Sequence, residues 1–201
     1  MPRDLQKWCW MGLALTVIAI YAWIIGPELN TSQWRPYVHT VPSENDTWND
    51  PNNAAPQYTA LIARHYDDLS QIPVDSDIES VTYLLPWDEE KLPQLSAWMK
   101  TLEPELNLLM ATTTMPWCRF IPPYDMQSLE AQQKRLYVTK TFARILLRSA
   151  NQDLYKNRLD LALSKQMACL RMAEHLWQQG TLFEQTVGYF IDRMARRALS
   201  R

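Results

Sequence analysis

The segment LYVTKTFARILL, residues 136–147, is apolar on nearly every side when it is projected onto a helix. Such a helix has no face to turn toward water, so other parts of the chain have to cover it. We therefore predict that this segment forms the middle of a long central helix. Asp125 or Ser128 provides the N-cap of this helix, which is expected to end near Tyr155.

Helical periodicity also predicts elements upstream of the central helix. Apolar residues recur at spacings of three and four after Asn53, which predicts a helix that ends at Pro73. The same spacing after Asp88 predicts a kinked helix, or two nearly collinear helices, as far as Thr112, because prolines interrupt the pattern. Between these elements, residues 74–86 alternate only briefly, which indicates irregular chain or at most a short strand.

Two further helices are expected downstream. The first ends at Gly180 and carries one apolar face, formed by Leu159, Leu163, Met167, Leu170, Ala173 and Trp177. Thr181 and Glu184 then form a capping box that opens a last helix. We expect its inward side chains to be Phe183, Val187, Phe190, Ile191, Met194 and Ala198. The fold class predicted for residues 54–201 is therefore all-α, with about five helices.

A separate apolar segment, WCWMGLALTVIAIYAWIIG, occupies residues 8–26 and contains no charge. As a helix it would rise about 28 Å, close to the thickness of the hydrocarbon core of a bilayer. Trp8 and Trp10 at one end, with Tyr21 and Trp23 at the other, have the positions of an interfacial aromatic belt. The segment is therefore predicted to be a transmembrane anchor helix that contacts membrane lipid.

Flanking charge predicts the topology of this anchor. Basic residues precede it and acidic residues follow it, so residues 1–7 are expected in the cytoplasm and the remainder across the inner membrane. Residues 27–53, polar and interrupted by proline, are predicted to form an extended tether. A cleaved signal peptide is the alternative, but the segment ends without a small-residue cleavage site. A buried helix of a soluble core is the other alternative.

Charge is distributed unevenly along the exported part. Residues 27–125 contain 15 acidic and 5 basic side chains, whereas residues 126–201 contain 6 acidic and 13 basic ones. The simpler interpretation is that two layers of one domain attract each other. The other interpretation is a basic surface at Arg193, Arg196 and Arg197 that binds an acidic partner or anionic lipid.

The cysteines allow two interpretations. Cys118 and Cys169 would both face an oxidising compartment, so they are candidates for a disulfide. Alternatively, Arg119 could lower the pKa of the Cys118 thiol and make it a nucleophile. The sequence places no histidine beside Cys118 to act as its base, which argues against catalysis.

Composition excludes several classes of function. The chain has four glycines, two of them in the predicted anchor, so it cannot form the glycine-rich loop that holds a nucleotide phosphate. The three histidines lack the spacing of a zinc or di-iron motif. We therefore predict no cofactor and no metal, and no nucleic-acid partner is expected outside the cytoplasm.

Residues 143–176, ARILLRSANQDLYKNRLDLALSKQMACLRMAEHL, resemble a tetratricopeptide-type helical hairpin. Ala150 takes the small position of the first helix, and Ala162 and Cys169 take the small positions of the second. Asn157 replaces the glycine usual at the turn, and the usual proline after the second helix is missing. The resemblance implies a TPR-like hairpin at about residues 126–178.

The chain also resembles single-pass bacterial membrane proteins that carry a helical extracytoplasmic domain. The segments that carry this resemblance are NAAPQY at 53–58, LPWDEE at 85–90, CRF at 118–120 and GTLFEQTVG at 180–188. The resemblance implies membrane anchorage and a helical domain but no activity. It also implies that further helices can follow Arg201.

These features favour a non-enzymatic scaffold or accessory subunit that binds another membrane or periplasmic protein through its helical domain. The chain contains nine tryptophans and nine tyrosines, residue types that often anchor protein interfaces. Two alternatives stay open. One is an extracytoplasmic thiol-dependent enzyme that uses Cys118, and the other is a small-ligand sensor.

Overall fold

The computed structural model of the chain describes residues 50–65, 69, 72–73, 76–120, 126–179 and 181–200. These residues contain seven α-helices and no named strand, so the predicted all-α class is confirmed for them. The predicted anchor at residues 8–26, its aromatic belt and most of the predicted tether lie outside the described residues. Among the helices that are described, none combines the length and apolar character needed to cross a bilayer.

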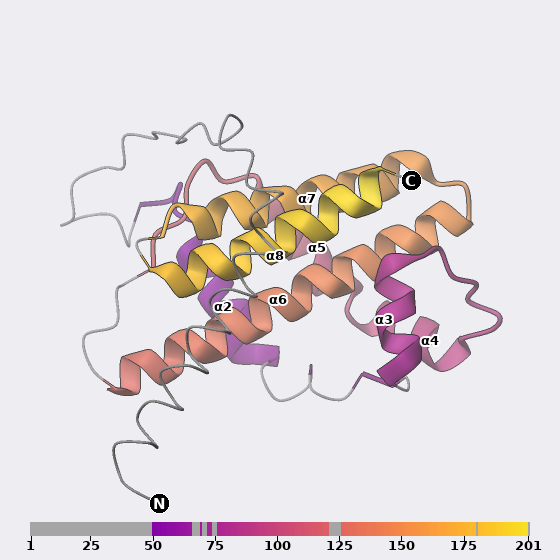
Figure 1. Cartoon of the computed structure of the whole chain (residues 1–201), viewed down its shortest axis with the longest axis horizontal. Coiled ribbons are helices and arrows are strands. Elements are labelled where there is room, and N and C mark those ends of the chain that lie inside the picture. The colour runs from indigo at the N-terminus through magenta and orange to yellow at the C-terminus, as the bar shows by residue number, and fades with distance from the viewer. Residues whose placement is uncertain are drawn as a thin grey trace, which may run out of the picture. The chain divides into compact units, whose positions relative to one another are not determined.

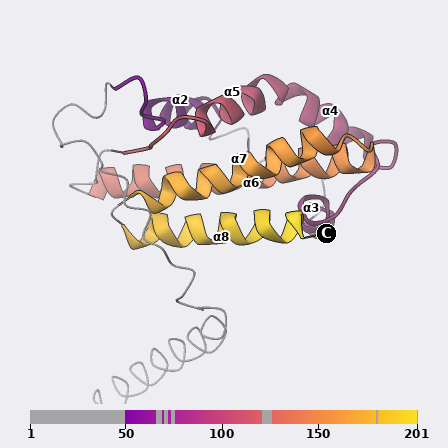
Figure 2. The same cartoon turned by 90° about the horizontal axis from the view of Figure 1, so that it is seen from above.

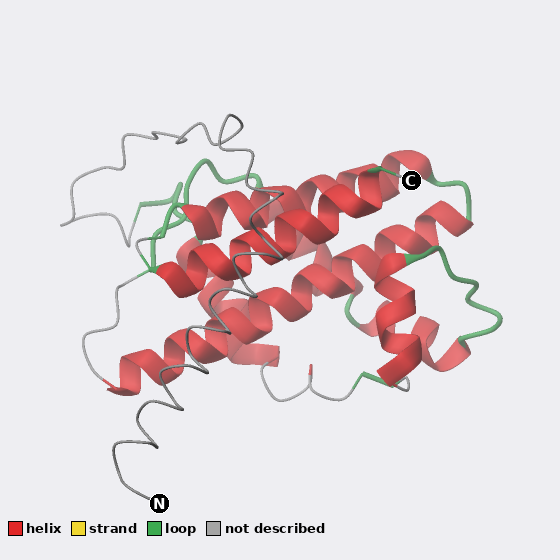
Figure 3. Cartoon of the chain, in the orientation of Figure 1, coloured by secondary structure: helices red, strands yellow, loops and turns green. Residues whose placement is uncertain are grey.

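The helices are arranged around one antiparallel pair, α6 (Met126–Tyr155) and α7 (Leu159–Trp177). One side of this pair is covered by α8 (Leu182–Leu199) and the short helix α3 (Ser76–Leu84), as Figures 1 and 2 show. The opposite side is covered by three helices, α2 (Ala55–His65), α4 (Pro93–Thr101) and α5 (Glu103–Thr113). Loops join these elements (Figure 3).

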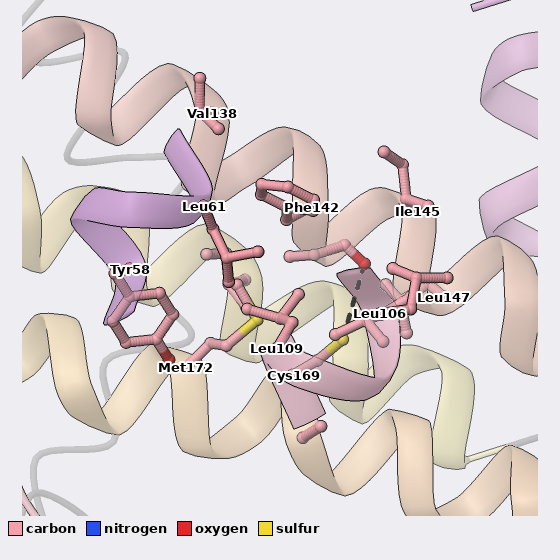
Figure 4. Close-up of a cluster of buried hydrophobic side chains, with 14 of the residues drawn as sticks. Tyr58, Leu61, Leu106, Leu109, Val138, Phe142, Ile145, Leu147, Cys169 and Met172 are labelled. Atoms are coloured by element: carbon pink, nitrogen blue, oxygen red, sulfur yellow. Dashed lines mark hydrogen bonds between the residues drawn. The ribbon is translucent and has the colours of Figure 1, made fainter. Parts of the chain in front are cut away.

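The 30-residue helix α6 is the centre of the core, as its sequence predicts. From Val138 to Asn151 every side chain is buried except those of Lys140 and Arg144. Figure 4 shows the cluster where α6 meets α2, α5 and α7, with Phe142 at its middle. Burying each large apolar side chain of this kind contributes roughly 1.5–3 kcal/mol. The stability of the domain therefore depends mainly on how completely α6 is covered.

The turn between α6 and α7 is a Schellman motif. The Arg158 N–H donates to the Asp153 carbonyl at 2.8 Å, and the Asn157 N–H donates to the Leu154 carbonyl at 3.0 Å. These two bonds require a left-handed residue between helix and loop, and Asn157 has a φ of 57°. Asparagine tolerates this conformation better than other residues with a β-carbon. It therefore replaces the glycine without breaking the hairpin.

The N-cap predicted at the start of α8 is confirmed, and the Glu184 side chain returns a bond to Thr181 through the hydroxyl of that residue. The Thr181 hydroxyl accepts a hydrogen bond from the Glu184 N–H at 3.3 Å and donates one to Glu184 Oε2 at 2.8 Å. The Glu184 carboxylate is buried and also pairs with Arg135 of α6. One acidic residue therefore caps α8 and joins it to the central helix.

The prediction of about five helices was wrong at residues 74–86, and for the segment from Asp88 to Thr112 one of its two alternatives holds. Residues 74–86 contain α3 instead of a strand, because tertiary contacts with α6 decide their conformation. The helix predicted from Asp88 to Thr112 is two helices, separated at Leu102, so the two-helix alternative holds. Pro93 and Pro104 stand in the first turns of α4 and α5, where a missing N–H costs no hydrogen bond.

A buried arginine holds α3 against the central helix. The Arg148 side chain is completely buried, and its Nε donates to the Thr82 hydroxyl at 2.9 Å. Its Nη2 donates to the Glu79 carbonyl at 3.1 Å and lies 3.2 Å from the Glu79 carboxylate. In addition, Asn151 donates to the Thr82 carbonyl, and the Trp87 indole donates to the Arg148 carbonyl. Polar bonds, more than an apolar stripe, therefore position α3.

The two C-terminal helices turn part of their predicted inward faces to solvent. Leu159, Leu163 and Met167 of α7 are exposed, as are Phe183 and Phe190 of α8. Half of the buried positions of α7 are taken by small residues, namely Ala162, Ala168, Cys169 and Ala173. Small side chains permit close helix packing. The larger side chains of α7 are divided between buried ones, such as Met172 and Leu176, and the exposed Leu159, Leu163 and Met167.

We expect Arg148→Ala to lower the free energy of unfolding by about 3 kcal/mol, because it leaves a cavity and removes one partner of a buried ion pair. Arg196→Ala is the matched control. It removes an arginine that is 68% exposed and paired within its own helix, so its cost should stay under about 0.5 kcal/mol. Urea denaturation of the full-length chain measures both values. Equal effects for the two variants would show that Arg148 does not hold α3.

Candidate interaction surface

Cys118, the candidate nucleophile, lies in the loop between α5 and α6, whose backbone is held by side-chain amides. The Gln178 side chain accepts the Cys118 N–H at 2.7 Å, and the Gln179 side chain donates to the Cys118 carbonyl at 2.6 Å. Asn53 accepts the Arg119 N–H at 2.9 Å and donates to the Arg119 carbonyl at 3.2 Å. The loop is thus fixed to the start of α2 and to the end of α7.

The surroundings of Cys118 suppress its reactivity. Its side chain is buried, and this burial raises the pKa of the thiol well above its usual value. The positive charge of Arg135 acts against the rise, and the negative charge of Glu184 adds to it. Arg119, the expected activator, is not among the described charges that shift this pKa. The arrangement keeps Cys118 as a neutral thiol, whereas the thiolate is the nucleophilic form.

His175 lies in the same region but forms a structural pair. Its Nε2 is 3.0 Å from the Met115 carbonyl, which can only accept, so Nε2 carries the proton. Its Nδ1, 3.0 Å from the Tyr58 hydroxyl, therefore accepts. Burial lowers the pKa of His175 to about 4. The ring is neutral at physiological pH and joins α7 to α2 and to the loop after α5.

The two cysteines named as a candidate disulfide are both free, buried thiols. Cys169 lies in α7, and its Sγ is 3.5 Å from the Ala143 carbonyl of α6 (Figure 4). Burial raises the pKa of the Cys169 thiol. In the part of the chain that is described, neither thiol faces solvent, so both act as small core residues.

An open groove of about 410 Å³ lies between α5 and α7. Small side chains, Ala111, Ser164 and Ala168, stand in it beside larger ones. The residues lining it from α5 and its end are Met110, Ala111 and Thr114, and those from α7 are Leu163, Ser164, Met167, Ala168 and Arg171. Sequence reasoning placed Leu163 and Met167 in the core and so missed this surface. The sequence does contain the row of large apolar residues on α7, but whether that row is exposed depends on where α5 packs.

The groove carries one charge. Arg171 is exposed and lines the groove one helical turn beyond Met167. None of the acidic side chains in the described residues forms an ion pair with Arg171. By contrast, Lys165 of α7 and Arg158 just before that helix both form ion pairs with Asp153, so their charges are neutralised. Arg171 therefore offers its charge to solvent beside an apolar surface.

The three arginines predicted as a partner surface lie on the exposed part of α8. Arg196 bonds both carboxylate oxygens of Asp192 at 2.8 Å, so part of this charge is neutralised within the helix. Arg193, Arg196 and Arg197 are all exposed. Leu182 and Phe183, the most exposed large apolar residues of α8, lie at the opposite end of that helix. The charge and the apolar surface of α8 are therefore separated along its length.

Comparisons with known proteins give no assignment: no family model, no curated protein and no solved structure matches the chain. Within the described residues, no group of three or more histidine, cysteine or acidic side chains is placed to hold a metal ion. The features that remain for a functional argument are therefore the exposed surfaces of α7 and α8.

Because the fold lowers the pKa of His175, its stabilising effect is complete above the unfolded-state pKa of about 6.5 and decreases as the pH falls toward 4. Between pH 7 and pH 5, we expect the wild-type chain to lose about 2 kcal/mol more unfolding free energy than His175→Gln. Acidic side chains titrate equally in both proteins. Urea denaturation at the two pH values checks this, and equal losses would refute the buried neutral state of His175.

The buried thiols lead to a second expectation. In a Cys9→Ser variant, a maleimide at neutral pH should label Cys118 and Cys169 at least about a thousandfold more slowly than it labels the unfolded chain. Mass spectrometry of peptides from the labelled protein measures the rate at each cysteine. Rapid labelling of Cys118 alone would instead support the thiol-enzyme alternative.

Proposed function

We propose that this protein is a membrane-anchored, non-enzymatic scaffold or accessory subunit that binds another membrane or periplasmic protein through its helical domain. The observation that carries the proposal is the exposed apolar surface of α7 and α8, which includes Leu159, Leu163 and Phe183 at 64%, 49% and 66% exposure. Monomeric proteins rarely leave large contiguous apolar surface in water. Single exposed leucines are ordinary, but Leu159, Leu163 and Met167 follow one another along α7, and Leu182 and Phe183 are neighbours at the start of α8.

The anchor belongs to the same proposal. Residues 8–26 are apolar and flanked by aromatic residues, and the charge around them favours a single pass with the helical domain outside the cytoplasm. A scaffold held at a membrane meets its partner at a high effective concentration, so even a modest surface is sufficient for binding.

The TPR-like assignment of the α6–α7 hairpin is also proposed. In support of it, Ala150, Ala162 and Cys169 are all completely buried where the two helices pack. Asn157 adopts the left-handed conformation at the position where the turn usually has a glycine. In addition, α8 packs along α7, as the first helix of a following repeat does.

The two alternatives have less support. A thiol-dependent enzyme needs an accessible thiolate, whereas Cys118 is buried and its pKa is raised. A small-ligand sensor needs a cavity that encloses most of its ligand, whereas the groove between α5 and α7 is open. Binding of a macromolecule agrees better with an open surface.

The proposal is tested by purifying the full-length chain from its native membrane in mild detergent. We expect one protein to co-purify in fixed ratio with the wild type. A Leu163→Glu, Phe183→Glu double variant should lose it while keeping its helical circular dichroism. Val81→Glu, which places the same charge on a half-exposed residue of α3, should retain it. A chain that purifies alone, or a partner kept by the double variant, would refute the proposal.

A further inference from the structure

We infer that the groove between α5 and α7 binds an amphipathic helix of the partner protein, with large apolar side chains in the groove and an acidic residue opposite Arg171. This inference rests on the proposed function and specifies the site and the chemistry of the partner. It is carried by the lining of the groove, by the spacing of the exposed residues on α7 and by the charge of Arg171, with which no acidic side chain in the described residues pairs.

The lining of the groove suits a helix. Leu163, Met167 and Arg171 recur every four residues, so they form a ridge along α7. Ala111, Ser164 and Ala168 beside this ridge are small, and small side chains allow another helix to approach closely. Met110 and Met167 are flexible and adapt their shape to an apolar partner side chain. An isolated small molecule would leave much of this open surface in water.

The exposed row on α7 sets the length of the occupant. It begins at Leu159, which is 64% exposed, and continues through Leu163 and Met167 to Arg171. At a rise of about 1.5 Å per residue the row is about 18 Å long, so a partner helix of roughly three to four turns covers it. Apolar residues at i, i+4 and i+8 on the partner would contact the first three positions.

The charge that lines the groove determines which polar residue the partner helix should carry. Arg171 lines the groove, and no described acidic residue pairs with it. A guanidinium that is partly covered by an apolar partner loses hydration, and it is compensated only if the partner supplies a carboxylate. A basic residue at that place would be repelled. Arg171 therefore selects acidic partner helices and fixes their direction along α7.

The exposed surface of α8 differs from the groove in how charge and apolar residues are placed. There Arg196 is already bonded to Asp192, and the most exposed apolar residues, Leu182 and Phe183, lie at the other end of the helix. Because the charge and the apolar residues lie at opposite ends of α8, a short partner segment would not contact both. The groove between α5 and α7 combines both within a few residues.

The test uses the full-length chain in detergent and synthetic stapled helices of about 18 residues as probes. Each probe carries an apolar row of leucine, methionine or phenylalanine at four-residue spacing. One member of each pair has glutamate one turn beyond the row, and the other has lysine there. Fluorescence anisotropy measures the dissociation constants. Among the glutamate probes, we expect the one whose apolar row binds most tightly to have a dissociation constant at least about fivefold lower than that of its lysine counterpart.

Two variants then locate the binding site. Arg171→Glu should reverse the preference, so that the lysine probe binds more tightly, and Leu163→Glu should weaken both probes at least tenfold. Phe183→Glu, on α8, is the matched control and should change neither value by more than about twofold. Absence of measurable binding, or a preference that Arg171→Glu leaves unchanged, would overturn the inference.

Other occupants of the groove give distinct results. Sedimentation that shows Leu163→Glu dissociating a dimer would assign the groove to a second copy of the chain. Displacement of the probe by a synthetic peptide of residues 30–49 would assign it to the chain's own upstream segment. Either result overturns the inference. A partner that still co-purifies with Leu163→Glu but not with Phe183→Glu also overturns it, while the scaffold function stands.

Discussion

The burial of α6 on all sides is the constraint on which the rest of this domain depends. A helix with a polar face can lie at a surface, but between Val138 and Asn151 α6 has almost no such face. Each neighbouring helix therefore covers one part of it. α7 does so through small residues, α2 and α5 through the cluster around Phe142, and α3 and α8 through charged contacts. The order of the layers follows from this one requirement.

Buried charges fix the positions that apolar packing leaves undetermined. Arg148, Asp153 and Glu184 are almost fully buried, and each has an oppositely charged partner. Burying a charge without its partner costs free energy. A helix that slides by one turn would separate such a pair, and this would cost more than the loss of a few apolar contacts. Arg148 thus fixes the register of α3, and Glu184 fixes that of α8. Glu79 pairs with Arg144 and Arg148 of α6, and Glu89 pairs with Lys156 just after that helix. Attraction between the acidic and basic halves of the chain therefore contributes to this arrangement.

The parts of the fold that the sequence predicted are those that local chemistry decides. The long helix α6, the N-cap at Thr181 and the turn at Asn157 each depend on residues close together in the chain. The helix α3 was missed because Thr82 and Tyr83 gain their conformation from Arg148, which is far away in sequence. For the same reason the sequence could name Cys118 but not its burial, and it could list Leu163 and Met167 but not their exposure. Burial depends on which helix packs where, and periodicity alone does not contain that information.

The exposed row on α7 follows from the same packing requirement, but its composition does not. Small residues such as Ala162, Cys169 and Ala173 allow close contact with α6 and α8. Met172 and Leu176 are buried as well, whereas Leu159, Leu163 and Met167 lie at the rim. Nothing in the fold requires those rim residues to be apolar. Glutamine or lysine has nearly the same helix propensity as leucine and would keep the surface soluble. Leu163 and Met167 therefore contribute little to folding, and the same holds for Arg171, which pairs with no acid among the described residues. Their arrangement agrees with the proposed binding of another protein, in which apolar area and one charge would be covered together.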